Sequence, residues 1–172
     1  VGLTALVYDR LGVTSLPNYS AVITLFNGGY MTIKTILDQK PGGVITIEPT
    51  STLQATVKKM CDQKIGALLV QSEGGNPVGI ITERDILCFC TSGPGQLDKV
   101  NVSDVMTKEL VVATLDTRIN DAKSIMTEKR FRHLPIVDNG KIIGIVSIGD
   151  LVKAMLEETA VEVKYLRDYI SS

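Results

Sequence analysis

One stretch occurs twice in the chain: GIITERD at residues 79–85 and GIVSIGD at residues 144–150. Each copy has the pattern of a buried apolar strand that ends at a hydroxyl residue, Thr82 or Ser147. An aspartate, Asp85 or Asp150, follows three positions later, and an apolar helical pattern follows the aspartate. Both copies therefore predict a strand that leads directly into a helix.

The hydroxyl-x-x-Asp pattern has two interpretations. In the first it is a capping box, in which Thr82 or Ser147 caps a helix and the aspartate accepts a hydrogen bond from a free backbone N–H. In the second the aspartate grips a sugar, because its two oxygens can accept hydrogen bonds from both adjacent hydroxyls of a ribose. The two are compatible, since a helix N-terminus is itself an anion site. The duplication of the pattern favours the sugar grip.

The segments that precede the two signatures also correspond. In the first copy they are a helical turn (32–37), a β-rich run (44–47), an amphipathic helix from residue 53, and strands at 67–70 and 78–81. In the second copy they are a turn (102–106), a run (111–113), a helix from residue 119, and strands at 134–137 and 142–146. Matching positions such as Met60 and Met126 lie 66 residues apart, and the offset falls to 65 after the hairpin loops.

Several boundaries follow from local residue chemistry. We expect Thr50 or Ser51 to cap the helix of the first copy, and Asp116 or Thr117 to cap that of the second. Asn139-Gly140 predicts a tight hairpin, because both residues accept a positive φ. The final helix is predicted to begin at Asp150.

The duplicated unit predicts the fold. A β-α-β-β-α unit of this size cannot bury its sheet face alone, whereas two copies can cover each other. We therefore predict an α+β (α/β-like) fold of two β-α-β-β-α repeats, at 31–95 and 96–156, packed about a pseudo-two-fold axis with symmetric clefts. Residues 1–30 lack a secretory or mitochondrial signal pattern and are predicted to be a leader or an arm.

The C-terminal region, residues 150–172, has a second pattern. Its apolar positions follow 4-3-4-3-4 spacing, a heptad-like seam with one polar interruption. They are Val152, Leu156, Thr159, Val163, Leu166 and Ile170. The alternatives are a contact between two copies and a helix that folds back on its own domain. A helix over these residues would be about 30 Å long, which favours a homodimer contact.

Composition excludes several classes of function. The 18 Lys and Arg residues balance the 19 Asp and Glu residues, which argues against nucleic-acid binding through a bulk basic field. No apolar run approaches the roughly 20 residues that a membrane span needs. The three cysteines form no zinc-site pattern and suit reduced thiols, so we predict a cytoplasmic location, with an organellar matrix as the alternative. The sequence contains no P-loop, dinucleotide or catalytic-triad pattern, so we predict that it is not an enzyme.

The duplicated unit resembles a tandem pair of CBS (cystathionine β-synthase) domains, a Bateman module, over roughly residues 31–156. The phrases FRHLPIVD at 131–138 and Met106-Thr107 are also similar to that family. The resemblance implies a regulatory module that binds an adenosyl ligand between its repeats and signals to a partner protein. AMP is the first expectation, with ADP, ATP, NAD and S-adenosylmethionine as others. The alternative is a structural or dimerisation protein with vestigial clefts.

The resemblance also assigns site residues. It implies ribose contacts at Asp85 and Asp150, with Thr82 and Ser147 at ribose or phosphate. For the purine it suggests the starts of the first strands, whose alternative is plain core: Thr46, Ile47, Val112 and Ala113. For the phosphate it suggests Arg132 and His133. Arg84, in the helix-opening turn of the first copy, could also reach phosphate, and the alternative for Arg84 and for His133 is an ordinary surface residue. Pro135 is a further candidate site residue. Because the first copy has Gly66 and Ala67 where the second has Arg132 and His133, we predict unequal sites.

Overall fold

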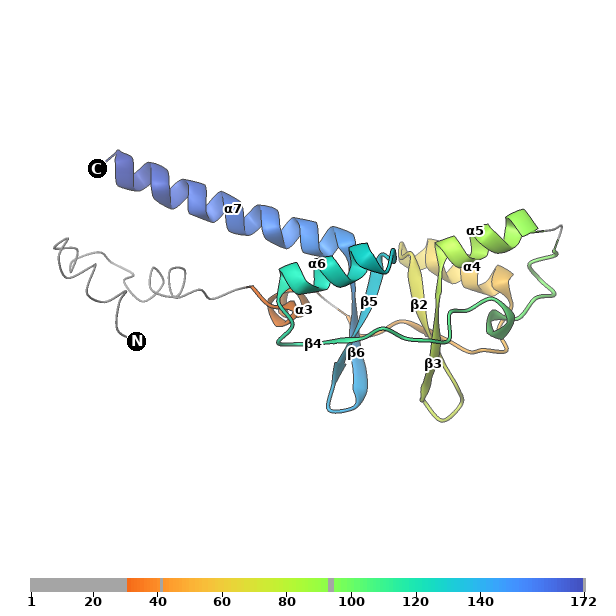
Figure 1. Cartoon of the computed structure of the whole chain (residues 1–172). Coiled ribbons are helices and arrows are strands. Elements are labelled where there is room, and N and C mark those ends of the chain that lie inside the picture. The colour runs from red at the N-terminus through yellow and green to blue at the C-terminus, as the bar shows by residue number, and fades with distance from the viewer. Residues whose placement is uncertain (1–30, 41, 93–94, 172) are drawn as a thin grey trace. The chain divides into compact units, whose positions relative to one another are not determined.

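The computed structural model describes residues 31–40, 42–92 and 95–171. The chain divides into two units, Val1–Met31 and Thr32–Ser172. The predicted leader, residues 1–30, lies outside the described residues. The helices and strands given below all belong to the second unit (Figure 1).

Each repeat contributes one three-stranded sheet. The first contains β1 (Thr46–Ile47), β2 (Ala67–Gln71) and β3 (Pro77–Thr82), and the second contains β4 (Ala113–Thr114), β5 (His133–Asp138) and β6 (Lys141–Ser147). In both sheets the two-residue strand pairs in parallel with the middle strand, which pairs antiparallel with the third. The predicted α+β fold of two similar repeats is confirmed.

The β-rich run of the second copy begins two residues later and ends one residue later than the sequence predicts. The sequence predicts a strand at 111–113, but β4 covers Ala113–Thr114. Val111 and Val112 precede the strand, and both side chains are exposed. β-propensity alone cannot distinguish them from Ala113, since strand pairing depends on what lies alongside.

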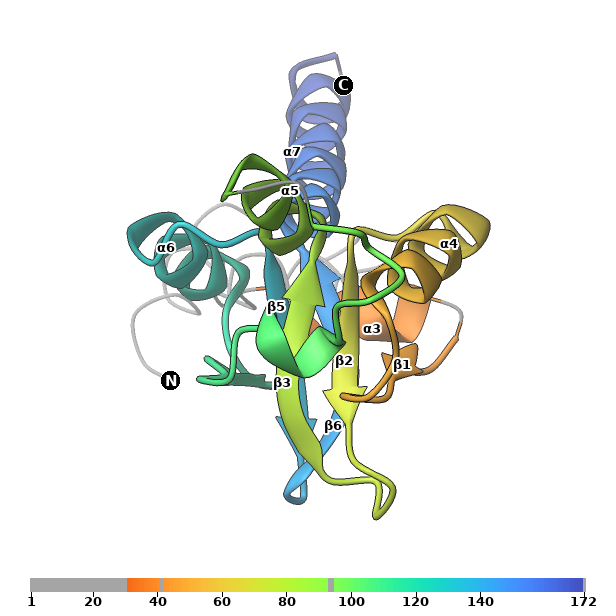
Figure 2. The ribbon, with the colours of Figure 1, turned by 90° about the vertical axis from the view of Figure 1, so that its right-hand side faces the viewer.

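The helices follow the sheets in the same order in both repeats. The first repeat has α4 (Leu53–Gln63) and α5 (Glu83–Ser92), and the second has α6 (Ile119–Glu128) and α7 (Ile148–Ile170). The two opening turns are α3 (Ile33–Gln39) and the 3₁₀ helix η1 (Val102–Asp104). Figures 1 and 2 show that α5 continues from the end of β3 and that α7 continues from the end of β6.

Two predicted caps are wrong. The N-cap of α4 is Thr52, whose hydroxyl accepts a hydrogen bond from the N–H of Ala55, and not Thr50 or Ser51. The residue at the N-cap of α6 is Arg118, with no side-chain capping bond, and not Asp116 or Thr117. The Thr117 hydroxyl instead accepts from the N–H of Thr114, so it closes the turn after β4. The final helix also begins earlier than predicted, at Ile148, with Ser147 as its cap.

Each opening turn packs on the other repeat. α3 lies beside β6 and α7, and η1 is bonded to the segment just before α4. The backbone bonds are Ile33 N to Thr117 O (2.9 Å), Lys34 N to Leu115 O (3.0 Å), Val102 N to Ser51 O (2.8 Å) and Ser103 N to Pro49 O (2.9 Å). The acceptors in the two repeats lie 66 residues apart, so one arrangement occurs twice. This exchange couples the repeats through backbone bonds.

The predicted bounds of the two repeats, residues 31–95 and 96–156, stay a prediction.

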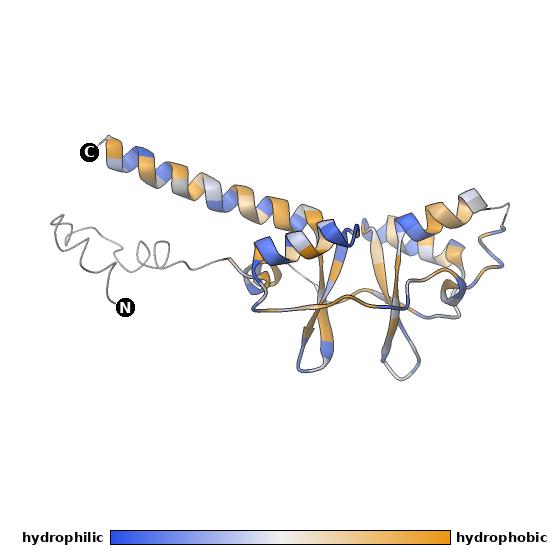
Figure 3. Cartoon of the chain, in the orientation of Figure 1, coloured by the Kyte–Doolittle hydropathy of each residue, from blue (hydrophilic) through white to orange (hydrophobic). Residues whose placement is uncertain are grey.

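The two repeats share one core pattern. In the first, the buried cluster contains Ile47, Leu53, Met60, Leu68, Val70, Ile81, Ile86 and Val102. Every member has a buried counterpart in the other half: Ala113, Ile119, Met126, Leu134, Ile136, Val146, Leu151 and Ile33. The apolar strands and helix faces that supply these side chains are visible in Figure 3. Because the same positions are buried in both repeats, the two signatures lie at equivalent places, where the third strand of each sheet leads into a helix.

The last helix, α7, is buried only near its start. Leu151 and Ala154 are buried, whereas Leu156 is 66% exposed and Leu166 is 59% exposed. Figure 3 shows that apolar residues continue along α7 past the repeat-2 sheet. Among the described helices, none has both the length and the apolarity that crossing a bilayer would require.

Candidate functional site

Both signatures form the same hydrogen-bonded corner at the start of a helix. Asp85 Oδ2 accepts from the N–H (2.8 Å) and hydroxyl (2.6 Å) of Thr82, and Asp150 Oδ2 accepts from the N–H (2.7 Å) and hydroxyl (2.8 Å) of Ser147. Each hydroxyl oxygen in turn accepts from the N–H of its aspartate. The capping box is therefore present. It satisfies backbone groups that a helix start leaves without intrahelical partners.

These corners retain hydrogen-bonding capacity for a ligand. Both aspartates use Oδ2 for capping, and Oδ1 accepts no hydrogen bond from the described residues. A carboxylate oxygen can accept two hydrogen bonds, so Oδ1 of Asp85 and of Asp150 can each accept ligand hydroxyls. Thr82 and Ser147 donate their only hydroxyl hydrogen to the aspartate, so toward a ligand these hydroxyls can only accept.

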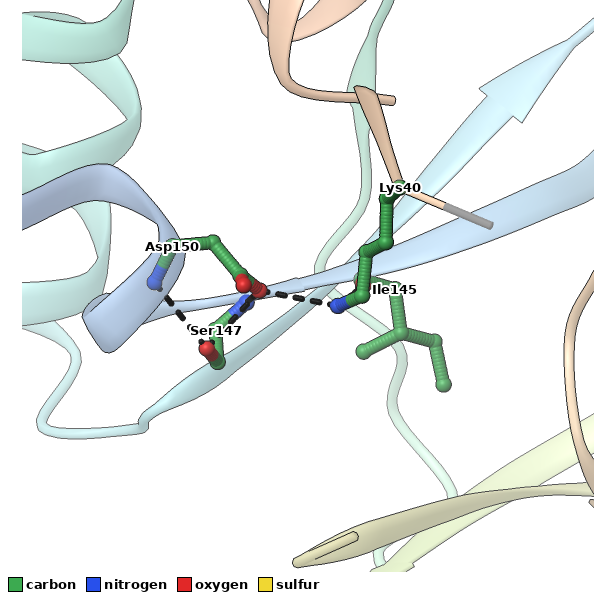
Figure 4. Close-up of polar contacts among 4 residues, drawn as sticks. All are labelled: Lys40, Ile145, Ser147 and Asp150. Carbon is green, nitrogen blue, oxygen red and sulfur yellow. Dashed lines mark hydrogen bonds and ion pairs between the residues drawn. The ribbon is translucent and has the colours of Figure 1, made fainter. Parts of the chain in front are cut away.

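A lysine that the sequence analysis missed contacts the second corner. Lys40 lies at the end of α3, and its ammonium donates to Asp150 Oδ2 (2.9 Å) and to the carbonyl of Ile145 (3.0 Å) (Figure 4). The side chains of Lys40 and Asp150 are 42% and 28% exposed. No local sequence pattern marks Lys40, because the contact depends on α3 packing on the other repeat.

The surroundings of Asp150 favour its charged form. Burial raises the pKa of the carboxyl, but the hydrogen bonds from Lys40 and Ser147 and the positive charge of Lys40 lower it more. The net pKa of Asp150 lies below its ordinary value, so the group is a carboxylate at neutral pH. A carboxylate only accepts hydrogen bonds, as a sugar grip requires.

His133 lies where the two repeats meet. It begins β5 opposite Ser147, and an added Cβ on Gly66 would lie 3.1 Å from His133 Cε1 and 2.7 Å from Glu83 Oε2. The imidazole of the second repeat and the carboxylate of the first are thus neighbours. Burial lowers the pKa of His133, Glu83 raises it and Lys40 lowers it, with a net pKa below the ordinary value. At neutral pH the imidazole is therefore uncharged.

The two predicted arginines lie at the same junction. Arg84, in the first turn of α5, donates from Nη1 to the carbonyl of Arg130 at 2.6 Å and so links the two repeats. Arg132 is exposed, and its carbonyl accepts from the N–H of Ile148 at 3.0 Å. Arg84 keeps further N–H donors, since a guanidinium has five.

The predicted purine residues divide into core and surface. Ile47 and Ala113 are buried, in agreement with the plain-core alternative for their side chains. Thr46 is partly exposed, and its carbonyl accepts from Lys59 Nζ at 2.6 Å. Val112 is exposed and Pro135 is buried in β5. Within the part of the chain that the structure describes, none of these side chains is hydrogen-bonded to either aspartate, so their role in binding a base stays a prediction.

Comparison with known proteins identifies the family of this duplicated unit. The CBS domain family matches residues 40–91 and 102–157. This chain belongs to the CBS domain family. Tandem CBS pairs are regulatory modules, and the match indicates no catalytic family.

Three relatives show how far the similarity extends. A mitochondrial CBS domain-containing protein of Arabidopsis thaliana, CBSX3, is 37% identical over 123 residues, which cover 69% of this chain and 60% of that protein. The crystal structure of a CBS-domain protein from Agrobacterium tumefaciens has a TM-score of 0.70 and 35% identity, covering 72% of this chain and 92% of the other. The crystal structure of CBSX2 in complex with AMP has a TM-score of 0.59 and 25% identity, covering 73% and 96%.

The chain spans only part of some of its relatives. It covers 60% of the Arabidopsis protein and 57% of an uncharacterized Methanopyrus kandleri protein that is 39% identical over 111 residues. The shared part is the CBS pair.

Proposed function

We propose that this chain is a ligand-sensing module that binds an adenine nucleotide, with AMP as the first candidate, in a cleft between its CBS repeats. The related structure of CBSX2 contains AMP, which supports this ligand class. ADP, ATP, NAD and S-adenosylmethionine share the adenosyl group and are the further candidates. No catalytic role is proposed for the chain.

The observation that carries this proposal is the state of the two aspartates. Asp85 and Asp150 are each fixed by capping bonds to Oδ2, while Oδ1 accepts nothing from the described residues. The two ribose hydroxyls are donors, and a fixed carboxylate is a matched acceptor for them. The hydroxyls of Thr82 and Ser147 cannot donate to a phosphate while they donate to these carboxylates. We therefore assign both corners to ribose.

The phosphate is proposed to lie mainly toward the second repeat. Lys40 contacts Asp150, and both are close enough to His133 to affect its pKa, as is Arg132. Asp85 forms no ion pair with the described residues. A phosphate is attracted to cations, so the site at Asp150 should hold a phosphorylated ligand more tightly than the site at Asp85.

Calorimetric titration with AMP, ATP, NAD and S-adenosylmethionine tests the proposal. We expect at least one ligand to bind more tightly than about 1 mM, a free energy of about −4 kcal/mol. Asp85→Ala and Asp150→Ala should each weaken or remove one binding event in protein that is shown to be folded by circular dichroism. If the aspartates only cap helices, these variants would lose stability while each folded molecule bound nucleotide as before. The absence of any binding would favour the structural alternative.

We further propose that two copies associate through α7. The exposed residues Leu156, Val163, Leu166 and Ile170 follow the heptad spacing, and a helix with the same spacing is the matched partner for such a seam. A second copy supplies that helix. Ligand binding would then change the arrangement of repeats or copies, through different affinities for two arrangements, and a partner protein would detect the change. The proposed compartment is the cytoplasm, with an organellar matrix as the alternative that the mitochondrial relative supports.

A further inference from the structure

At equivalent positions of β3 and β6, the strand backbone is hydrogen-bonded to different kinds of group. In the first repeat, Ile80 and Thr107 exchange two backbone hydrogen bonds of 2.9 Å each. In the second repeat, the equivalent residue is Ile145, and its carbonyl accepts from the Lys40 ammonium instead. A backbone bridge opens only when a segment of chain moves, whereas a side chain can rotate away. The contact in the second repeat is therefore the exchangeable one.

The same ammonium competes for a crowded acceptor. Asp150 Oδ2 receives three donors, two from Ser147 and one from Lys40, although a carboxylate oxygen offers only two lone pairs. Of the described residues, Thr82 alone donates to Asp85 Oδ2, with two hydrogen bonds. The pair of Lys40 and Asp150 is partly exposed to solvent, and ion pairs of this kind contribute little to stability. Of the three donors to Asp150 Oδ2, Lys40 is thus the one whose hydrogen bond takes the least free energy to break.

We infer that Lys40 is the specificity residue that selects phosphorylated nucleosides at the Asp150 site. The ribose hydroxyls bind the free Oδ1 of Asp150, and the ammonium of Lys40 leaves the crowded Oδ2 and turns to the phosphate of the same ligand. A lysine suits this exchange, because its charge is compact and its four-carbon stem is flexible. The inference rests on the proposed function and deepens it, since it names the residue that distinguishes AMP from adenosine.

The exchange also gives α3 a part in ligand recognition. Lys40 immediately follows Gln39, the last residue of α3, which packs on β6 and α7 of the second repeat. Without ligand, the ammonium fastens the end of α3 to β6 and to the start of α7. With ligand, those two bonds are given up for one to phosphate.

The test is calorimetric titration of AMP and of adenosine into wild type and Lys40→Met. Lys34→Met is the matched control, because Lys34 lies on the same helix and pairs with Asp38 at 3.5 Å. We expect wild type to prefer AMP by about tenfold or more, the worth of one charge-assisted hydrogen bond. Lys40→Met should lose most of that preference and bind adenosine at least as tightly as wild type does. Lys34→Met should match wild type.

A second variant keeps the test informative if Lys40→Met folds poorly. Lys40→Arg keeps the charge, so it should retain a preference for AMP even where Lys40→Met is poorly folded. If folded Lys40→Met keeps the wild-type ratio of AMP to adenosine affinity, or if Lys40→Arg loses it, the inference is overturned while the proposed function stands. If wild type binds neither compound, the inference is overturned, and the proposed function falls with it only if ATP, NAD and S-adenosylmethionine also fail to bind.

Discussion

Gly79 lies directly against Thr107, where an added Cβ would come within 2.7 Å of the Thr107 carbonyl oxygen. The neighbouring residue, Ile80, exchanges two backbone hydrogen bonds with Thr107, so this carbonyl is held in place. At the equivalent Gly144 the closest group would be Leu37 Cδ2, at 2.8 Å. One glycine thus faces fixed backbone, and its counterpart faces the end of a flexible side chain.

This difference predicts unequal effects of the same substitution. Gly79→Ala should destabilise the protein by about 1–3 kcal/mol, because either β3 or the segment at Thr107 must move. Gly144→Ala should cost less than about 1 kcal/mol, because Leu37 can change rotamer. Urea unfolding followed by circular dichroism measures both. Equal losses in the free energy of unfolding, or a larger loss for Gly144→Ala, would contradict the difference between the two contacts.

The low pKa of Asp150 predicts an acid-dependent contribution to stability. Because its folded pKa lies below the ordinary value of about 3.8, its carboxylate stabilises the fold fully above that value. The contribution is lost as the pH falls through the folded pKa. Wild type should therefore be more stable than Asp150→Asn at pH 7, with the difference shrinking toward pH 3. Urea unfolding at both pH values measures it, with the exposed Asp138→Asn as the control.

A difference for Asp150→Asn that is the same at both pH values would contradict this account. It would mean that charge contributes nothing at this position and that only the capping geometry matters. Asp138→Asn should show little difference at either pH, because Asp138 makes no ion pair with the described residues.

His133 is the only histidine in the chain, so its imidazole can be followed directly by proton NMR. We expect a pKa below about 6.5 in the free protein, because burial outweighs the opposing effect of Glu83. A depressed folded pKa also means that stability is lost as the pH falls below about 6.5. If phosphate binds nearby, AMP should raise this pKa and adenosine should not. A pKa that AMP leaves unchanged would remove His133 from the phosphate site.

The seam on α7 predicts a dimer that a single charge can disrupt. Light scattering coupled to size exclusion should give twice the monomer mass for wild type and the monomer mass for Leu166→Glu. The substitution places a charge in the apolar seam, where it would be desolvated on association. Lys164→Gln, an exposed residue outside the seam, should remain dimeric. A wild-type monomer, or a Leu166→Glu dimer, would contradict the α7 contact.

The repeated core was predictable because burial leaves a periodic mark in the sequence. Met60 and Met126 carry the same helical stripe, and the two signatures end equivalent buried strands. The caps were less predictable, because several hydroxyl residues compete at each helix start. Thr52 caps α4, whereas Thr117 bonds to Thr114 in the preceding turn.

Contacts between the repeats could not be predicted from the sequence. Lys40 and Asp150 are 110 positions apart, and their ion pair exists only because α3 packs on the second repeat. The guanidinium of Arg84 bonds to the carbonyl of Arg130, 46 positions away, where the two repeats meet, and its predicted contact with phosphate stays a prediction. Local periodicity carries no information about which surface of one repeat a turn from the other will cover.

A crystal structure of the chain with AMP tests the central claim most directly. We expect the two ribose hydroxyls to lie within hydrogen-bonding distance of the Asp150 carboxylate, with the capping bonds from Ser147 intact. Well-ordered AMP bound elsewhere, with the Asp150 and Asp85 carboxylates contacting only the protein, would contradict the assignment of these two corners to ribose.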